Sequence, residues 1–116
     1  MSKENYDAVL KMMIALESLL LYERESKKDN LSERMALIMG NTYDDRLKIL
    51  TTMEQLYEIR SKIVHQGSID VNIIDRNQLQ YFTFLCIVII LEKYQAEKII
   101  NIKDFINWIY KLKFSN

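Results

Sequence analysis

Proline is absent from this chain of 116 residues, and glycine occurs only twice. Proline cannot donate a backbone hydrogen bond within a helix, and glycine is the residue that most often ends one. Few positions therefore force the backbone out of a helix, and apolar residues recur every three or four positions, the spacing of one helical face. The sequence predicts an all-α fold, an up-and-down bundle of four to five helices.

A single hydrophobic core is expected, because a chain of this length buries roughly two thirds of the surface that its unfolded form exposes. Nearly half of the residues (49%) are apolar, which is enough for one such core. No internal repeat and no linker composition divides the chain. We therefore expect a single helical domain over residues 1–116.

The charged, cysteine and histidine residues exclude several classes of protein. The 16 basic and 16 acidic side chains cancel, so no overall positive field draws the chain to nucleic acid, although a local basic cluster still can. Cys86 is the only cysteine and His65 the only histidine, which excludes an intrachain disulfide and a closed zinc site. We expect no metal, no cofactor and a location in the reducing cytoplasm.

Two segments bear on membrane association. Residues 1–7 are polar and mixed in charge, unlike a signal or transit peptide. The most apolar stretch, residues 81–91, is about 17 Å long as a helix, whereas the hydrocarbon core of a bilayer is roughly 30 Å thick. The sequence predicts a buried helix there and no membrane span.

Apolar spacing and capping residues give the expected bounds of the helices. Asn30 with Glu33, and Thr42 with Asp45, match the pattern that opens a helix. The predicted helices cover residues 5–25, 30–40, 43–65, 75–100 and 102–113, with a loop over residues 68–74. The fourth helix is apolar on nearly every side, which predicts a place at the centre of the bundle or across a dimer interface.

Two charged residues, Glu17 and Arg60, stand among apolar neighbours one helical turn away on both sides. An unpaired buried charge is unfavourable by several kcal/mol, so such residues need a partner. Spacing alone leaves two structural interpretations open. Either Glu17 and Arg60 form an ion pair between packed helices, or Arg60 extends its tip to solvent.

His65 follows Arg60 by five residues, which is about 140° around an ideal helix, so the two residues do not share a face. A long arginine side chain can still reach round the helix. His65 lies in the last turn of the third helix, where the backbone carbonyls favour a protonated imidazole. The plainest interpretation is a histidine at a helix end on a solvated surface.

The segment around these residues, LYEIRSKIVHQG at residues 56–67, resembles the signature of the HEPN superfamily, most closely its Apea-like branch. Two upstream segments agree with the resemblance. ALESLL at residues 15–20 is similar to the glutamate-bearing first helix of that branch, and LSERMALI at residues 31–38 is similar to its short second helix. One departure is Gln66, since the branch more often has glycine directly after the histidine.

The resemblance implies a bundle of four to five helices that dimerises and acts as a metal-independent endoribonuclease, in a toxin or phage-defence setting. Arg60 and His65 match the catalytic arginine and histidine of that family. We expect Glu17 to orient Arg60 by a charge-assisted bond. Ser61 and Lys62 are expected as secondary contacts, and Tyr57 as a stacking or hydrogen-bonding residue, which completes the predicted site.

Such a reaction needs no metal, because RNA carries its own nucleophile in the 2′-hydroxyl. Histidine can take or give a proton near neutral pH, and the forked donors of arginine fit phosphate oxygens. The chain has a single histidine, whereas the chemistry usually uses two proton-transfer groups. A homodimer whose third helices meet near the two-fold axis would bring His65 and Arg60 of both subunits to one scissile phosphate.

Two further hypotheses belong to other classes. In one, the chain is a catalytically inactive module for dimerisation or for binding RNA or a nucleotide, which keeps the bundle but not the reaction. In the other, it is the toxin half of a toxin and antitoxin pair, in which a nucleotidyltransferase-like partner covers or modifies the site. A fused or associated protein would then supply the specificity.

Overall fold

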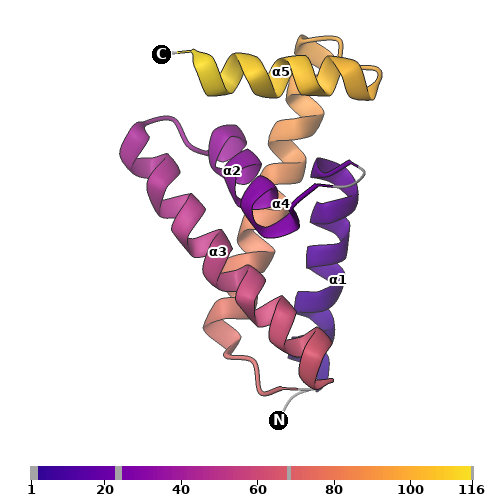
Figure 1. The fold of residues 1–116 in the computed structure, drawn as a ribbon, viewed down its shortest axis with the longest axis vertical. Coiled ribbons are helices and arrows are strands. Elements are labelled where there is room, and N and C mark those ends of the chain that lie inside the picture. Colours follow the sequence, from indigo (N-terminus) through magenta and orange to yellow (C-terminus); the bar gives the residue numbers. More distant parts are fainter. Residues whose placement is uncertain (1–2, 23–24, 68, 116) are drawn as a thin grey trace.

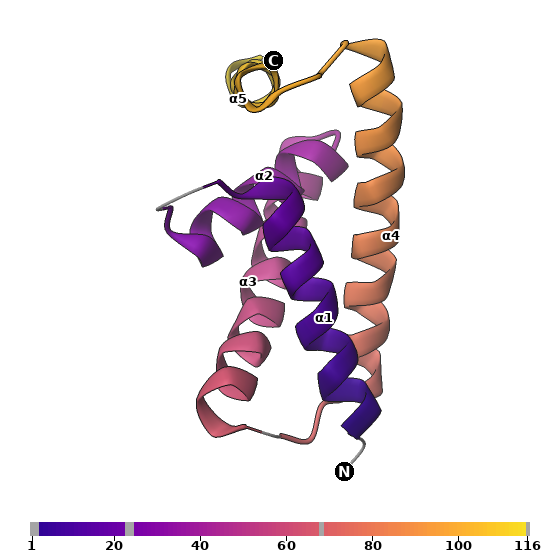
Figure 2. The ribbon, with the colours of Figure 1, turned by 90° about the vertical axis from the view of Figure 1, so that its right-hand side faces the viewer.

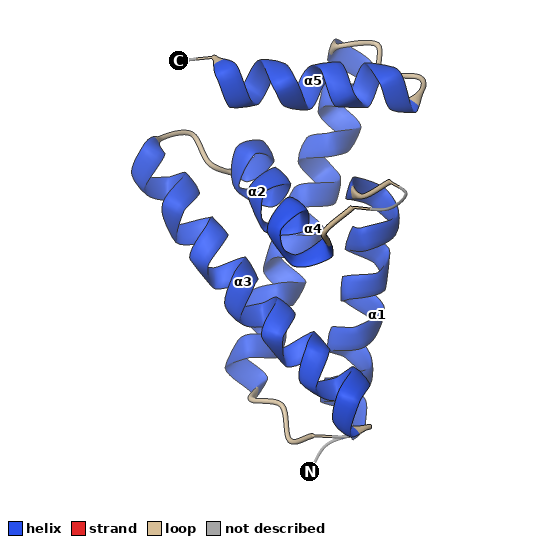
Figure 3. Ribbon diagram, in the orientation of Figure 1, coloured by secondary structure: helices blue, strands red, loops and turns tan. Residues whose placement is uncertain are grey.

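Five helices make up the regular structure in a computed structural model that describes residues 3–22, 25–67 and 69–115. The helices are α1 (Lys3–Leu20), α2 (Lys27–Met39), α3 (Tyr43–Gln66), α4 (Ile73–Ala96) and α5 (Ile102–Phe114). Within the described residues, loops and turns connect the helices (Figure 3). This confirms the predicted all-α class.

The three long helices α1, α3 and α4 run along the length of the molecule (Figure 1). The short helix α2 packs mainly against α3, while α1 packs mainly against α4. Helix α5 lies across one end of the bundle (Figures 1 and 2). The up-and-down description therefore fits the three long helices, whereas α2 and α5 lie crosswise.

The core forms where one face of each helix turns inward. In α1, side chains spaced four, three and four residues apart are completely buried, as the periodicity predicts for one helical face. They meet fully buried side chains of the next three helices in one continuous cluster. The fully buried apolar side chains of these four helices are Val9, Met13, Leu16, Leu20, Leu31, Met35, Met53, Leu79, Cys86 and Ile90.

The start of α2 differs from the prediction. The helix begins at Lys27, and Asn30, expected as its cap, lies inside the first turn with its side-chain amide donating to the Ser26 carbonyl at 2.7 Å. The predicted capping box is therefore wrong. The first turn, residues 27–30, has no apolar residue, so the apolar spacing gave no sign of it.

Helix α1 ends at Leu20, five residues before its predicted end. The Tyr22 N–H donates to the Glu25 carboxylate at 2.8 Å, which turns the chain toward α2. Residues 23–24 of the predicted polar break lie outside the described residues.

The ends of α3 agree with the prediction to within one residue. The Thr42 hydroxyl accepts from the Asp45 N–H at 3.1 Å, so this cap is confirmed. The helix ends at Gln66, and Gly67 follows with a positive φ of 85°, the conformation for which glycine is favoured. This end places His65 in the last turn of α3.

Helix α4 is shifted toward the N-terminus relative to its predicted bounds. The Asn72 side chain accepts from the Ile74 N–H at 2.8 Å, so the helix begins at Ile73, inside the segment predicted as a loop. Residue 68 of that segment lies outside the described residues. The helix ends at Ala96, before Lys98, whose φ of 53° is not helical.

The prediction that α4 is buried holds for one side of the helix only. Leu79, Phe82, Cys86 and Ile90 are buried, whereas other large apolar side chains of α4 are exposed. By length and composition alone, α4 is the one helix in the described parts of the chain that could cross a membrane. Residues 81–91, whose length of about 17 Å argued against a membrane span, are only part of this helix of 24 residues.

Candidate functional site

Three of the predicted site residues meet between α1 and α3. The Tyr57 hydroxyl donates to Glu17 Oε1 at 2.9 Å, and Arg60 Nη2 lies 3.4 Å from the same oxygen and 3.5 Å from Oε2. The side chains of Arg60 and Glu17 are 19% and 13% exposed. The expected bond between Glu17 and Arg60 is thus present, and the guanidinium does not extend freely into solvent.

Burial sets the electrostatics of this cluster. Burial, and after it the hydrogen bond and the negative charge of Glu17, raise the pKa of Tyr57 to about 12, so its phenol is a neutral donor at physiological pH. The Arg60 guanidinium carbon lies 5.3 Å from the centre of the Tyr57 ring, close enough for a cation–π contact. Among the described residues, Arg60 Nε is buried without a hydrogen-bond partner.

His65 lies apart from this cluster. It is exposed in the last turn of α3, and its side chain makes no hydrogen bond or ion pair with any described residue. Ser61 is half-buried and Lys62 is exposed on the same final turns. The structure therefore brings together Glu17, Tyr57 and Arg60, and it leaves His65 and Lys62 facing solvent, where a substrate could reach them.

Replacement of Tyr57 by phenylalanine tests the cluster. Loss of the hydroxyl leaves Glu17 one donor short, so we expect the free energy of unfolding at pH 8 to fall by about 1 kcal/mol. The raised pKa makes the protonated phenol stabilising below pH 10, and this contribution disappears as the pH rises toward 12. Denaturant unfolding of the parent and of Tyr57→Phe at pH 8 and pH 11 should therefore show a smaller difference at pH 11. A difference that does not change with pH would contradict this assignment.

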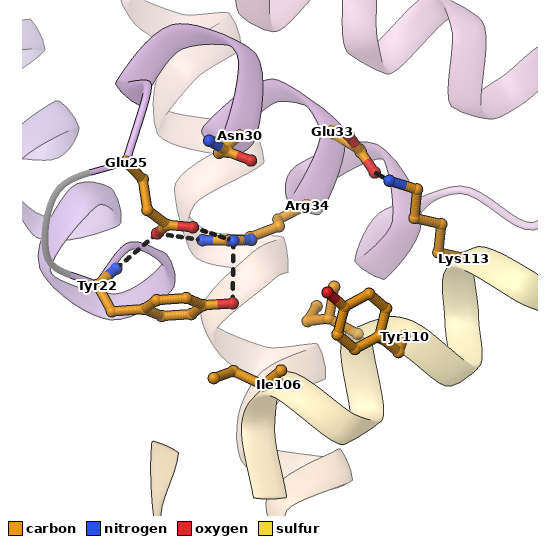
Figure 4. A pocket seen from close by; sticks show the side chains of 9 residues that line it. Tyr22, Glu25, Asn30, Glu33, Arg34, Ile106, Tyr110 and Lys113 are labelled. Atoms are coloured by element: carbon orange, nitrogen blue, oxygen red, sulfur yellow. Dashed lines mark hydrogen bonds and ion pairs between the residues drawn. The ribbon is translucent and has the colours of Figure 1, made fainter. Parts of the chain in front are cut away.

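A second polar cluster, centred on Arg34, was not found by sequence reasoning (Figure 4). Arg34 Nη1 donates to the Leu20 carbonyl and to Glu25 at 2.8 Å each, while Nη2 donates to the Tyr22 hydroxyl at 3.0 Å and to Glu25. Three of the four residues one turn from Arg34 are apolar, a weaker form of the signal that singled out Glu17 and Arg60, whose four such neighbours are all apolar. That signal could have found it.

Arg34 borders a pocket of about 320 Å³ between α2, the turn before it and α5. Glu33 and Lys113 form an ion pair of 2.9 Å across the pocket (Figure 4). Arg34 is 8% exposed, and both of its terminal nitrogens are already engaged by the chain, so it is not free to hold an anion. The pocket is lined by Tyr22, Glu25, Asn30, Glu33, Arg34, Ile106, Ile109, Tyr110 and Lys113.

The Arg34 cluster is best explained by a structural role. The bond to Arg34 holds the pKa of Glu25 below its ordinary value, so the carboxylate stays charged and keeps the turn after α1 attached to α2. Burial raises the pKa of Tyr22, which keeps that phenol neutral. No group of three histidine, cysteine, aspartate or glutamate side chains that could hold a metal ion occurs within the described ranges.

Comparison of the chain with protein-family models, with curated proteins and with solved structures finds no match. The resemblance to the HEPN superfamily therefore depends on the motifs of residues 15–20, 31–38 and 56–67. The geometry adds that the glutamate of the first segment contacts the tyrosine and arginine of the last.

Proposed function

We propose that this chain is a metal-independent endoribonuclease of the HEPN type that acts in the cytoplasm. The observation that carries the proposal is the fixed position of Arg60, which Glu17 holds from α1 and Tyr57 supports from α3, five residues before an exposed histidine. A guanidinium held in place and an accessible imidazole can supply the charge stabilisation and the proton transfer that phosphodiester cleavage by the 2′-hydroxyl needs.

In this mechanism the RNA supplies the nucleophile and the protein supplies charge and proton transfer. Arg60 stabilises the negative charge that develops on the phosphate oxygens. His65 takes the proton of the 2′-hydroxyl or gives one to the departing 5′-oxygen. Lys62 is exposed on the last turns of α3, and it serves as an added contact to the RNA backbone, with Ser61 beside it.

A homodimer is part of the proposal, because one histidine cannot act as base and acid in the same step. Two copies of the chain would place His65 of each subunit on opposite sides of the scissile phosphate. A two-fold contact is self-complementary, so a single surface suffices for both subunits.

Incubation of the protein with single-stranded RNA in EDTA tests the reaction class. We expect cleavage that persists in the chelator and leaves a 2′,3′-cyclic phosphate and a 5′-hydroxyl, because the nucleophile comes from the substrate. RNA in which the 2′-hydroxyls are replaced by hydrogen is the control and should stay intact. Cleavage that stops in EDTA, or products with a 5′-phosphate, would contradict the proposal.

A second candidate function is a binding or dimerisation module without catalysis. It is favoured by the ion pair itself, since Glu17 already balances the charge that Arg60 would offer to a phosphate. In this case Arg60→Ala weakens assembly or RNA binding, and no RNA is cleaved. Assembly measured beside turnover for this variant separates the two functions.

A toxin or phage-defence role, with an antitoxin or an associated protein that controls the site, is the setting in which we propose that the ribonuclease acts. Expression of the parent chain should then arrest growth. Arg60→Ala and His65→Ala should relieve the arrest at equal protein levels. Arrest that both variants still cause would contradict this role.

A further inference from the structure

Helix α4 exposes a row of large apolar side chains along one side, which we call the α4 face. With Phe84 as reference, these side chains lie within about 140° of the helix circumference. Figure 2 shows α4 at the edge of the molecule, with its outer side away from the other helices. The α4 face consists of Ile73 (48% exposed), Ile74 (71%), Tyr81 (59%), Phe84 (67%), Ile87 (38%) and Leu91 (62%).

The exposed area of the α4 face approaches that of one side of a dimer contact. The exposed fractions equal about three and a half complete side chains, or roughly 700 Å² at about 200 Å² for each large side chain. A stable interface of standard size buries about 800 Å² on each partner. The α4 face with its immediate rim therefore has the area that one partner of a dimer needs.

The charge pattern of the α4 face fits self-association. No charged side chain occurs from residue 77 to residue 91, and two of the six side chains of the face are aromatic. Interface centres are depleted in charge and enriched in aromatic residues. Exposed Glu92 lies at the edge of the same arc, at the C-terminal end of the face. Because a two-fold contact places the same surface against itself, the uncharged centre of the face meets its copy without like-charge repulsion.

Two exposed amide side chains favour a protein over a lipid bilayer as the partner of the α4 face. Asn77 and Gln80 are exposed within the same arc of α4. Hydrocarbon offers an amide no hydrogen-bond partner, which makes its burial in a bilayer unfavourable. An amide of a second protein chain can satisfy these hydrogen bonds, because asparagine and glutamine side chains each carry both donors and an acceptor. From the area, the charge pattern and these amides, we infer that a second copy of this chain packs on the α4 face.

This contact differs from the third-helix contact expected from the sequence. Most exposed positions of α3 are polar or charged, among them Lys48, Gln55 and Glu58. Its exposed large apolar side chains, Tyr43, Leu47 and Val64, are fewer than those of the α4 face. The inference depends on surface residues of α4 alone, so it holds whether or not the chain cleaves RNA.

Substitution of Phe84 by glutamate tests the inference. The side chain is 67% exposed, so the charge does not disturb the core of a single chain. In a dimer it places two unpaired carboxylates at the centre of the contact, and we expect the dissociation constant to rise at least about 100-fold. Sedimentation equilibrium should give twice the chain mass of 13.9 kDa for the parent and the chain mass for the variant.

Phe114→Glu is the matched control, because Phe114 is a similarly exposed aromatic residue (75%) on α5 and should leave the dimer intact. If Phe84→Glu does not fold by circular dichroism, Leu91→Lys repeats the test at a position that is 62% exposed. A monomeric parent at all concentrations would overturn the inference. So would a dimer that both α4 substitutions leave unchanged, or a parent that floats with phospholipid vesicles as a monomer.

Discussion

The variant His65→Ala is expected to cleave RNA at least about 100-fold more slowly than the parent in EDTA, because general acid–base catalysis contributes factors of about 10² to 10⁴. His65 is the only histidine, so no second imidazole can replace it. It is exposed, so its loss should leave the stability of the fold almost unchanged. The rate is measured with a short single-stranded RNA at equal concentrations of folded protein.

Gln66→Ala is the matched control for this prediction, since residue 66 is exposed and adjacent to His65 in the same helix end. It should retain the rate of the parent. Arg60→Lys keeps a positive charge but loses the forked donors, and we expect it to be slow as well. If His65→Ala cleaves as fast as the parent, the proposed mechanism is wrong.

The second large effect concerns stability. Arg34→Ala is expected to lower the free energy of unfolding by about 3 kcal/mol, because removal of one partner of a buried ion pair leaves the other uncompensated. Arg34 contacts Glu25, the Tyr22 hydroxyl and the Leu20 carbonyl, so the substitution leaves three groups without this donor. Urea denaturation of the parent and the variant measures the difference.

Lys113→Ala is the control for Arg34→Ala, because it breaks the exposed pair with Glu33 and should change stability by at most about 1 kcal/mol. The pH dependence adds a second check. The lowered pKa of Glu25 stabilises the fold above its ordinary value of 4.5, and this contribution disappears as the pH falls through the lower value of the folded protein. The difference between the parent and Arg34→Ala should therefore shrink in acid. Equal losses for Arg34→Ala and Lys113→Ala would contradict the structural role of Arg34.

Local sequence signals predicted the helices well where a specific residue marks their ends. Thr42 and Gly67 bound α3 as expected, because a hydroxyl cap and a positive φ are local requirements. The start of α2 was missed, since its first turn has no apolar residue. The all-α class followed from the absence of proline and did not depend on these ends.

The candidate site was predictable in part. Apolar neighbours singled out Glu17 and Arg60 and left open whether they pair or Arg60 reaches solvent, and the structure contains the pair. A weaker form of this signal was present at Arg34, but its partners Tyr22 and Glu25 lie in the turn after α1, where helical spacing gives no information. Periodicity also cannot tell which apolar side of α4 meets the core, because a helix that is apolar all round has no preferred face.

The direction in which two α4 helices pair affects how far apart the two copies of His65 lie. The C-terminal end of α3 and the N-terminal end of α4 lie at the same end of the molecule (Figure 1). Helices that pair in the same direction therefore place both copies of His65 at one end of the dimer, but on the sides away from the contact, because α3 lies opposite the outer side of α4 (Figure 2). Helices that pair in opposite directions separate them by about the length of α4, roughly 36 Å for its 24 residues.

The distance between the two copies of residue 66 in solution tests most directly whether two subunits share one cleft. A nitroxide on Gln66→Cys reports this distance by pulsed electron paramagnetic resonance, and Cys86 stays unlabelled because it is buried and its pKa is raised to about 12. If the two subunits share one cleft, we expect a single distance between the two labels, below about 18 Å, which is half the length of α4. A separation near or above about 36 Å, or no coupling between two labels, would contradict it.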